Sequence, residues 1–327
     1  MTENKMQAIR LTQPCAAADM KPTMVDMPKL KSVYVLVKVR AFGVNESEVT
    51  SRKGESSPDF QFPRILGIEG VGVIDQVNAN SSFKPGQQVA TMMGGMGRGR
   101  AIDGSYTEYM LVKEENLIPF ESDLDWSILG ALPEMLQTAY GSISQGLHVQ
   151  SGDLLLVRGG SSTVGLMASV LARHMGVKVI ATTRNAAKLT TMKELGIDYP
   201  VLDDQDFVSR VQKIAPNKVD KALELVGISI LFQDMGLVKD GGLACFTGAL
   251  GGQWTLDNFS PFMIPTRVYL TSYAGEAKDL PAEYFSHVLN MIEEVPIAKV
   301  YNGLGEVGQA QANLESGKFS GKHVVVL

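Results

Sequence analysis

The sequence predicts an α/β protein of two domains, and three observations lead to this prediction. The chain has 327 residues, about twice the length of an average domain. Residues up to about 120 form short β-rich segments between turn residues, whereas strand and helix patterns alternate after about residue 123. A glycine-containing turn joins an apolar strand to a helix near the middle of the chain. We therefore expect a partly open β-barrel domain and a doubly wound parallel sheet domain.

The first 120 residues carry the β pattern. Three segments are rich in valine and isoleucine, several with period-two alternation, and prolines lie between them: 32–45, 65–77 and 86–93. This pattern is typical of strands in an all-β module. The glycine-rich stretch 92–105 is predicted to be a loop, after which a strand resumes at 104–112.

The rest of the chain alternates between the two kinds of element. Helices are predicted at 124–147, 163–175, 185–196 and 282–295, and strands at 154–160, 178–183, 220–226, 241–248, 268–273 and 321–327. Such alternation indicates right-handed βαβ units on a parallel sheet. We place the sheet domain at 124–272 and assign 1–123 and 273–327 to the barrel domain, so that the two domains are nested.

Composition excludes several classes of function. The chain is 45% hydrophobic and 20% charged with a net charge of −5, which argues against nucleic-acid binding. It has no signal-peptide pattern at its start and no apolar run of membrane-spanning length, so we expect a cytoplasmic protein. Two distant cysteines, Cys15 and Cys245, exclude a disulfide scaffold and a cysteine-rich zinc site.

The segment around residue 160 is the main cofactor signal. An apolar strand runs into Gly160-Ser161-Ser162-Thr163-Val164-Gly165, which has the outline of G-x-G-x-x-G with a serine at the middle glycine. Gly160 would allow a sharp turn, Gly165 would allow close helix packing, and helix-start amides would bind a pyrophosphate. The three hydroxyls could add donors. An ordinary βαβ turn with a Ser/Thr cap is the alternative.

The end of the next strand indicates which dinucleotide binds. Proteins that use NAD usually carry an acid there, which binds the ribose 2′-hydroxyl. This chain has Thr183 and Arg184 followed by Lys188, with no acid before Glu194. Two cations and a hydroxyl suit a 2′-phosphate, so the sequence favours NADPH over NADH. Two solvated cations at a helix start are the alternative.

Motifs along nearly the whole chain resemble the medium-chain dehydrogenase/reductase superfamily, and within it the zinc-independent, zeta-crystallin-like quinone oxidoreductases. They are FGVN at 42–45, LGIEGVGV at 66–73, KPGQQV at 84–89, GSYTEYMLV at 104–112, ALPEMLQTAYG at 131–141, the glycine turn, GGLACFTG at 241–248 and ESGKFSGK at 315–322. The resemblance implies a Rossmann-type NADPH domain and a GroES-like, partly open β-barrel domain.

The resemblance also indicates which chemistry to expect. Zinc relatives place a cysteine where Asn45 stands and a histidine where Ile68 stands, so no metal is expected here. The chemistry implied is hydride transfer from NADPH to a quinone or a small α,β-unsaturated carbonyl. An enoyl-thioester (2-enoyl-CoA/ACP) reductase and a non-catalytic NADPH-binding protein are the alternatives.

Carried over position by position, the resemblance implies a cofactor pocket. Asn45 and Thr138 would approach the nicotinamide and 160–164 the pyrophosphate, while Thr183, Arg184 and Lys188 would hold the 2′-phosphate. Residues near the ribose and nicotinamide would be Val226, Phe246, Thr247, Gly248 and Leu250. Asn45 as a turn residue, and Thr138 as a helix residue bonded to its own backbone, are the alternatives.

No general acid is assigned from the sequence. Thr50 stands where many quinone-branch relatives have a tyrosine, and Gly54 is followed by Glu55 where enoyl reductases have a tyrosine. Tyr106 and Tyr140 are more easily explained as packed rings. The catalytic residues therefore stay unknown, with Asn45, Thr138 and Tyr140 as candidates.

Three further expectations concern surfaces. Arg98 and Arg100 either receive an anionic substrate or belong to a surface loop. An adaptable apolar pocket wall, or simply core, is expected from Met92, Met93, Met96, Phe262 and Met263. The resemblance implies a homodimer, which we expect to be joined along the strand edge at 241–252.

Overall fold

The computed structural model contains two compact units. It describes residues 4–56, 60–92, 103–292 and 295–327. Unit 1 comprises Met1–Gln137 and Glu276–Leu327, and unit 2 comprises Thr138–Gly275. The first boundary lies after the predicted residue 123, because helix α2 (Trp126–Ala131) packs on strands of unit 1. The return to unit 1 also lies slightly later than the predicted residue 273.

Unit 2 is built on a six-stranded sheet. The strands follow the order β12-β11-β10-β13-β14-β15, and every neighbouring pair is parallel. Their bounds are β10 Leu154–Arg158, β11 Lys178–Thr183, β12 Tyr199–Leu202, β13 Val219–Glu224, β14 Val238–Phe246 and β15 Tyr269–Ser272. The predicted doubly wound parallel sheet is confirmed, and β12 is a strand that the sequence patterns did not indicate.

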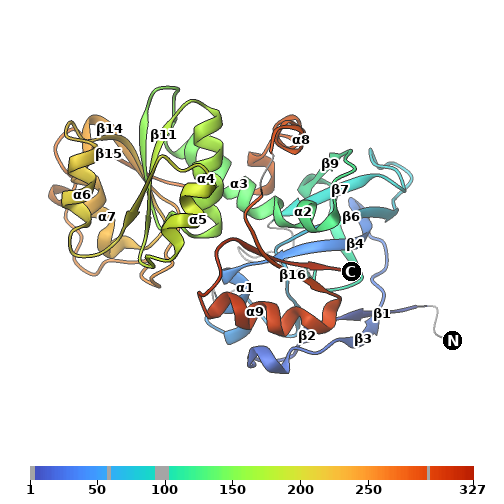
Figure 1. The fold of residues 1–327 in the computed structure, drawn as a ribbon. Coiled ribbons are helices and arrows are strands. Elements are labelled where there is room, and N and C mark those ends of the chain that lie inside the picture. Colours follow the sequence, from blue (N-terminus) through green and yellow to red (C-terminus); the bar gives the residue numbers. More distant parts are fainter. Residues whose placement is uncertain (1–3, 57–59, 93–102, 293–294) are drawn as a thin grey trace. The chain divides into compact units, whose positions relative to one another are not determined.

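Helices cover both faces of this sheet. Helices α4 (Thr163–His174) and α5 (Lys188–Glu194) lie on one face, and α6 (Phe207–Ile214) and α7 (Ile228–Met235) lie on the other (Figure 1). Burial on the sheet explains the apolar side of α6, where Phe207 and Val211 are buried. Because β10 and β13 are neighbours, the strand order reverses between them, and the loops after these strands diverge at the sheet edge where dinucleotides bind.

The edge of this sheet differs from the expected one. Strand β14, which carries most of the predicted dimer edge at 241–252, pairs with β13 on one side and with β15 on the other. The described edge strand on this side is therefore β15. The expectation was wrong because the short strand at Tyr269–Ser272 follows a long connection and adds itself outside β14.

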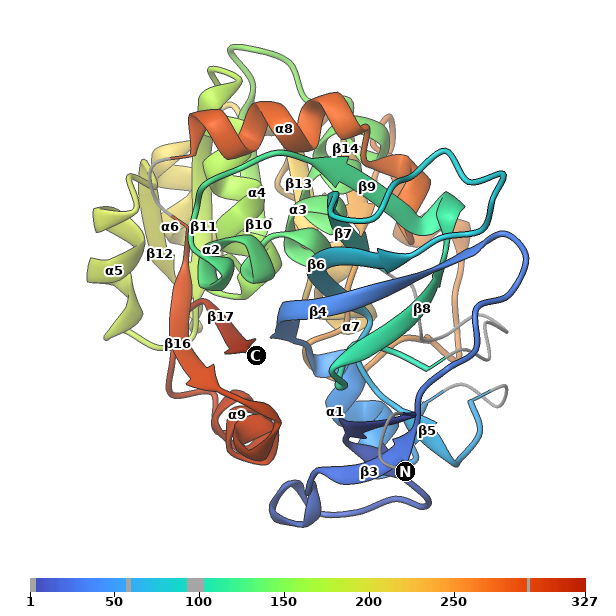
Figure 2. The same cartoon turned by 90° about the vertical axis from the view of Figure 1, so that its right-hand side faces the viewer.

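Unit 1 contains a larger sheet in which β4 (Tyr34–Val44) is an inner strand. This strand pairs with β6, β8 and β17, as Figure 2 shows. The larger sheet also contains β6 Glu69–Gln76, β7 Gln88–Met92, β8 Tyr109–Lys113, β9 Leu117–Phe120, β16 Ile297–Asn302 and β17 Lys322–Val326. Two small antiparallel pairs join β1 (Lys5–Ala8) to β3 (Thr23–Asp26) and β2 (Arg10–Leu11) to β5 (Arg64–Ile65). Among the described residues of this unit, an apolar core cluster includes Phe42 and Tyr106.

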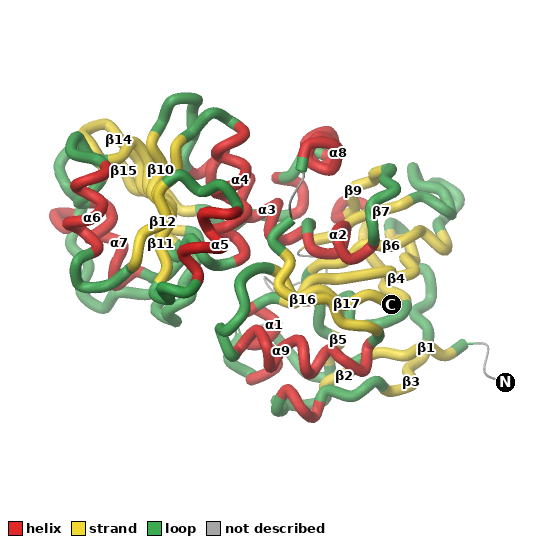
Figure 3. Tube along the Cα trace, in the orientation of Figure 1, coloured by secondary structure: helices red, strands yellow, loops and turns green. Residues whose placement is uncertain are grey.

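Helices of unit 1 lie at its margins and include α1 (Glu46–Lys53), α8 (Ala282–Met291) and α9 (Val307–Glu315) (Figure 3). Strand β17 returns the chain from α9 to the middle of the sheet beside β4. The single helix predicted at 124–147 is three pieces, namely α2, α3 (Pro133–Gly141) and a π-helical turn at Ser142–Gly146. Pro133 begins α3, which fits the preference of proline for a first helical turn.

Candidate functional site

The turn between β10 and α4 has the geometry expected of a phosphate loop. Its left-handed residue is Gly159, with φ 75°, rather than Gly160 as the motif suggested. Gly160 serves close packing instead, because a Cβ there would lie 2.6 Å from the Cβ of Ala181. A Cβ on Gly165 would lie 2.6 Å from the carbonyl oxygen of Gly159, so α4 also packs tightly against the turn.

The start of α4 offers hydrogen-bond donors to an anion. Ser162 caps the helix, since its Oγ accepts from the amide of Gly165 at 3.1 Å. Among the described residues, the backbone amides of Thr163 and Val164 have no acceptor. Free amides at the first turn of a helix, in a positive dipole field, suit a pyrophosphate. The residues present therefore fit a dinucleotide, and the predicted cap and the predicted phosphate loop are compatible.

The end of β11 places the predicted cations beside this turn. The amide of Ser161 donates to the carbonyl oxygen of Thr182 at 3.2 Å, which joins the turn to β11. Thr183 is buried, and its Oγ1 accepts from the amide of Asn185 at 3.2 Å. Arg184 is exposed, while Lys188 is half-buried at the start of α5, and this burial lowers its pKa. Both cations thus follow the strand end at which the 2′-position of an adenosine ribose is read.

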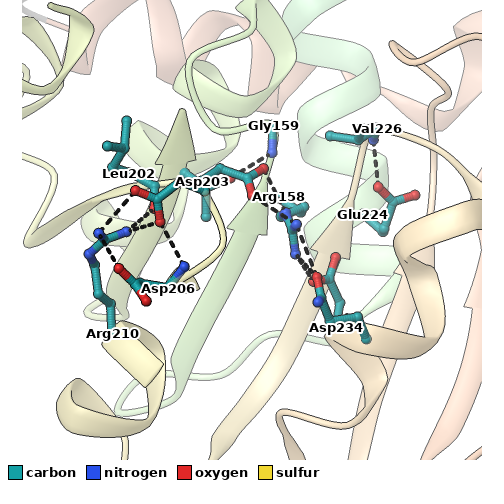
Figure 4. Close-up of polar contacts among 12 residues, drawn as sticks. Arg158, Gly159, Leu202, Asp203, Asp206, Arg210, Glu224, Val226 and Asp234 are labelled. Atoms are coloured by element: carbon teal, nitrogen blue, oxygen red, sulfur yellow. Dashed lines mark hydrogen bonds and ion pairs between the residues drawn. The ribbon is translucent and has the colours of Figure 1, made fainter. Parts of the chain in front are cut away.

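Every acid in the neighbouring loop after β12 is paired with an arginine (Figure 4). Asp203, whose amide donates to the carbonyl oxygen of Thr183, is bound by Arg158 through two hydrogen bonds of 2.9 Å. Asp204 and Asp206 form ion pairs with Arg210. These pairs offset the negative charge beside the end of β11, which favours an anionic ligand there.

Arg158 is a buried residue that the sequence analysis missed. It is the last residue of β10, and its guanidinium also donates to Asp234 at 2.5 Å and stacks 3.8 Å from the ring centroid of Phe207. A single side chain therefore ties β10, which leads into the glycine turn, to the β12 loop, α6 and α7. An arginine at the end of an otherwise apolar strand was the available signal.

Two carboxyls near Arg158 have raised pKa values. Burial raises the pKa of Asp234 to about 8, against the attraction of Arg158. Burial also raises the pKa of Glu224 to about 7, although Glu224 accepts hydrogen bonds from the amides of Val226 and Gly227. The carboxyls of Asp203, Glu224 and Asp234 all lie near the single guanidinium of Arg158. Uptake of a proton by one of them therefore relieves the excess negative charge.

Asp234→Asn is expected to reduce the pH dependence of the stability of unit 2. The folded pKa of Asp234, about 8, lies above its ordinary value of 3.8, so the folded state holds a proton that the unfolded state has released. Through this group, the free energy of unfolding falls as pH rises from about 4 to 8. The asparagine variant should therefore gain more stability relative to the wild type at pH 8 than at pH 5.

Hydrogen exchange of β10 and β13 amides at the two pH values measures this difference within unit 2. Asp257→Asn, at an exposed aspartate, is the control and should change nothing at either pH. An equal effect of Asp234→Asn at pH 5 and pH 8 would contradict the prediction.

The remaining predicted cofactor residues of unit 2 lie at the same sheet edge. Leu250 and Thr247 donate backbone hydrogen bonds to the end of β13, at the carbonyl oxygens of Leu225 and Glu224. A Cβ on Gly159 would lie 3.1 Å from Val226 and 3.4 Å from Leu250, so these residues flank the glycine turn. Phe246 ends β14, and Gly248 follows two residues later.

Ser142 links Thr138, one of the predicted residues of α3, to the sheet edge at Thr247. The hydroxyl of Ser142 donates to the carbonyl oxygen of Thr138 at 2.6 Å and lies 3.0 Å from the hydroxyl of Thr247. Tyr140 is half-buried on the same helix, and its carbonyl oxygen accepts from the hydroxyl of Ser144 at 2.6 Å. Both residues stay candidates.

Asn45 lies in unit 1, at the N-cap of α1, against a buried ion pair. The ammonium of Lys322 and the carboxylate of Glu69 form this pair, with side chains 1% and 0% exposed. Asn45 Oδ1 accepts from Lys322 at 2.5 Å, and Asn45 Nδ2 donates to Glu69 Oε1 at 2.9 Å. Asn45 itself is half-buried. Its side chain is therefore part of a polar network, which a plain turn residue would not require.

A second buried carboxylate, Glu48, lies beside this network. It accepts hydrogen bonds from the amides of Asn45 at 2.9 Å and Ile68 at 2.7 Å and from the hydroxyl of Tyr106. Burial raises the pKa of Glu48 to about 7. Burial and Glu48 raise the pKa of Tyr106 well above its ordinary value, and its ring is 0% exposed. The explanation of Tyr106 as a packed ring with a bonded hydroxyl agrees with this geometry.

Other expected residues are not gathered into a site. Met92 is buried at the end of β7, whereas Phe262 is 98% exposed and Met263 is 38% exposed. Arg98, Arg100, Met93 and Met96 lie outside the described residues.

Within the described ranges, no group of three His, Cys, Asp or Glu side chains is arranged to hold a metal ion. The same residues include no helix of sufficient length and apolarity to cross a membrane.

Comparison with known proteins finds two family models that match segments of this chain. A family model named "Alcohol dehydrogenase GroES-like domain" matches residues 31–122, and one named "Zinc-binding dehydrogenase" matches 163–294. A quinone oxidoreductase from Pongo abelii is 29% identical over 69% of this chain and 68% of its own length. A 2-methylene-furan-3-one reductase from Solanum lycopersicum is 29% identical over 69% of this chain and 58% of its own. The crystal structure of AibC, 26% identical, superposes with a TM-score of 0.88 over 99% of this chain and 96% of that one.

Proposed function

Because this chain is an oxidoreductase of the medium-chain dehydrogenase/reductase superfamily, similar to its quinone oxidoreductases, we propose that it is an NADPH-dependent, zinc-independent reductase. Its substrate would be a quinone or a small α,β-unsaturated carbonyl. The observation that carries the proposal is the end of β11, where Arg184 and Lys188 stand beside a loop whose acids are all paired. The similarity to a quinone oxidoreductase and to a 2-methylene-furan-3-one reductase supports the substrate class.

In this proposal the residues of unit 2 bind and orient the cofactor. The amides of Thr163 and Val164 would hold the pyrophosphate, Arg184 and Lys188 the 2′-phosphate, and the residues after β13 and β14 the ribose and nicotinamide. NADPH, when bound, supplies hydride from its nicotinamide C4. Catalysis would come mostly from orientation of the two reactants.

The residues at positions 45 and 68 support a zinc-independent reaction. Asn45 offers an amide that is already bonded to Lys322 and Glu69, and Ile68 offers an alkyl side chain. Neither is a thiolate or an imidazole, the ligands that a catalytic zinc would take from these positions. The reduction would then depend on an electrophile that accepts hydride without a Lewis acid.

The hydrogen bond of the Tyr106 phenol to Glu48 favours a quinone over an enoyl thioester. The hydroxyl of Tyr106 is buried and donates to Glu48. A reduced quinone can take its protons from solvent, whereas an enoyl reductase gains more from a placed acid.

A screen of NADPH oxidation tests the proposal. Purified protein is assayed against benzoquinones, naphthoquinones, enals, enones and crotonyl thioesters, with NADH in parallel reactions. We expect turnover of quinones or enones with NADPH. Faster turnover of crotonyl thioesters would instead identify an enoyl-thioester reductase. Tight binding of NADPH with no oxidation across the panel would identify a non-catalytic NADPH-binding protein.

We also propose a homodimer, joined along the edge strand β15 instead of β14. An edge strand offers unpaired backbone groups to a second chain. Large side chains are exposed on and before this strand, with Phe262 98%, Trp254 62% and Tyr269 60% exposed. Such a group of apolar residues is typical of an interaction surface.

Phe262→Glu is expected to shift the protein from dimer to monomer. Phe262 is almost fully exposed, so the charge should leave the fold of unit 2 intact while it opposes burial in an interface. Light scattering at several protein concentrations measures the change. Met24→Glu, at a residue 61% exposed on β3 of unit 1, is the control and should remain dimeric. An unchanged dimer in Phe262→Glu would show that the interface lies elsewhere.

A further inference from the structure

Asp203 lies next to the strand end at which a 2′-phosphate is proposed to bind. In the parallel pair of β11 and β12, Thr183 is level with Leu202, so Arg184 and Asp203 are the next residues along the two strands. The amide of Asp203 donates to the carbonyl oxygen of Thr183 at 2.8 Å, which joins the two strand ends. Neighbouring strands are about 4.8 Å apart. An acid therefore lies beside the first of the two cations assigned to the phosphate.

Arg158 engages the carboxylate of this acid, as Figure 4 shows. Its Nε and Nη2 donate to the two oxygens of Asp203, each at 2.9 Å, and the two side chains are 5% and 13% exposed. Since β11 lies between β10 and β12 in the sheet, Arg158 reaches past β11 to make this contact. Two parallel hydrogen bonds fix the direction of a carboxylate and also compensate its charge. Both oxygens of Asp203 are thus engaged by a cation that is not assigned to the phosphate.

The charge of Arg158 is left to Asp203 near neutral pH. Arg158 also donates to Asp234, but burial raises the pKa of Asp234 to about 8, so this carboxyl holds a proton at lower pH. The next acids of the loop, Asp204 and Asp206, pair with Arg210 instead. Compensation of Asp203 therefore depends on Arg158.

We propose that Arg158 determines dinucleotide specificity without contacting the ligand, because it keeps Asp203 from acting as a free carboxylate at the end of β11. The inference rests on the proposed function, in which Arg184 and Lys188 bind a 2′-phosphate. A free carboxylate beside Arg184 would repel that phosphate and would compete with it for the guanidinium. NADH, which has no phosphate there, would not be repelled. Arg158 is thus a positioning residue that acts through Asp203 and favours NADPH.

A binding experiment on the full chain tests this role without turnover. R158M/D234N leaves Asp203 without its cation and removes the other acid that Arg158 had bonded. Fluorescence titration gives the Kd of NADPH and of NADH. We expect the Kd of NADPH to rise by about tenfold, an effect of the size that one uncompensated charge has near a protein surface, while the Kd of NADH stays the same. D234N by itself is the matched control and should change neither Kd.

The ratio of the two Kd values decides between specificity and a general structural effect. An equal rise for NADPH and NADH in R158M/D234N would overturn the proposal, because Arg158 would then only support the fold of unit 2. Unchanged Kd values for both dinucleotides would overturn it as well.

Removal of the freed carboxylate should restore the binding of NADPH. R158M/D203N/D234N has no acid at position 203, so its Kd for NADPH should return to within about threefold of the wild-type value. A Kd that stays raised would overturn the proposal, because the loss would not act through Asp203. D203N in otherwise wild-type protein tests the same point if R158M/D234N does not fold. It leaves Arg158 with spare positive charge and should bind NADPH at least as tightly as the wild type; weaker binding would contradict the proposed role.

Salt separates a charge effect from a change of shape. The Debye length falls from about 10 Å at 0.1 M salt to about 3 Å at 1 M, so the difference in NADPH affinity between R158M/D234N and the wild type should shrink at 1 M salt. A difference that salt does not alter would overturn the proposal.

Failure of the proposed function has a different signature. If wild-type protein binds NADPH no more tightly than NADH, the proposed NADPH dependence is itself wrong. If the wild type prefers NADPH and R158M/D234N keeps that preference in full, only the role of Arg158 is overturned.

Discussion

Arg184→Ala combined with Lys188→Ala is expected to weaken NADPH binding by about tenfold to a hundredfold while NADH binding stays the same. Charge-assisted hydrogen bonds contribute about 1.5–3 kcal/mol each, and about 1.4 kcal/mol corresponds to a tenfold change in affinity. Arg184 is exposed, so solvent screening places the expected loss below the sum of two full contributions. NADH has no 2′-phosphate, and its affinity should therefore be unaffected.

Fluorescence titration with both dinucleotides measures this change in selectivity. Lys193→Ala is the matched control, because Lys193 is an exposed lysine in the last turn of the same helix α5. The control should bind both dinucleotides as the wild type does. Equal weakening of NADH and NADPH in the double variant would mean that the two cations support the fold. No weakening at all would place the 2′-phosphate elsewhere and remove the main support for NADPH.

Arg158→Met is expected to destabilise unit 2 by about 3–5 kcal/mol, the cost of breaking a buried charge cluster by removal of one partner. Asp203 and Asp234 would lose their guanidinium, and both are within the interior or at its margin, with side chains 13% and 1% exposed. Arg158 also contributes its stacking on Phe207. Hydrogen exchange of β10 and β13 amides, measured by mass spectrometry, reports the opening of unit 2 by itself.

Two further variants make this result decisive. Arg210→Met removes an arginine of α6 whose pair with Asp204 is 35% and 36% exposed, and it should cost much less stability than Arg158→Met. Neutralising the two carboxyls bonded to Arg158, in R158M/D203N/D234N, should recover part of the lost stability, because less uncompensated charge then remains buried. Similar effects of Arg158→Met and Arg210→Met would show that burial does not govern the cluster.

Much of the architecture was predictable because its signals are local. The strand, glycine turn and helix at 154–175 are contiguous, and periodicity and glycine spacing indicate them without reference to the rest of the chain. The strand at 178–183 was located to the residue. Strand β12 and helices α6 and α7 were not indicated, since short elements with mixed patterns carry weak periodic signals.

The candidate site was predictable to the extent that its residues lie at strand ends. Thr183 ends β11, Arg184 follows it and Val226 follows β13, and the rule that parallel strands end at one sheet edge places all three at the same edge. The edge strand of the sheet was misplaced because sequence order does not give strand order. A strand as short as Tyr269–Ser272 decides which strand is outermost, and it does so only when it pairs with β14.

The sequence by itself determined the fold class, the glycine turn before α4 and the cationic end of β11, because each is encoded within a few consecutive residues. Only the tertiary structure decided which charges are paired. Arg158 meets Asp203 and Asp234 from 45 and 76 residues away, and Lys322 meets Asn45 from 277 residues away. A buried charge requires a partner, and that partner is supplied by whichever distant segment the packing brings alongside. Neither spacing nor periodicity records this pairing.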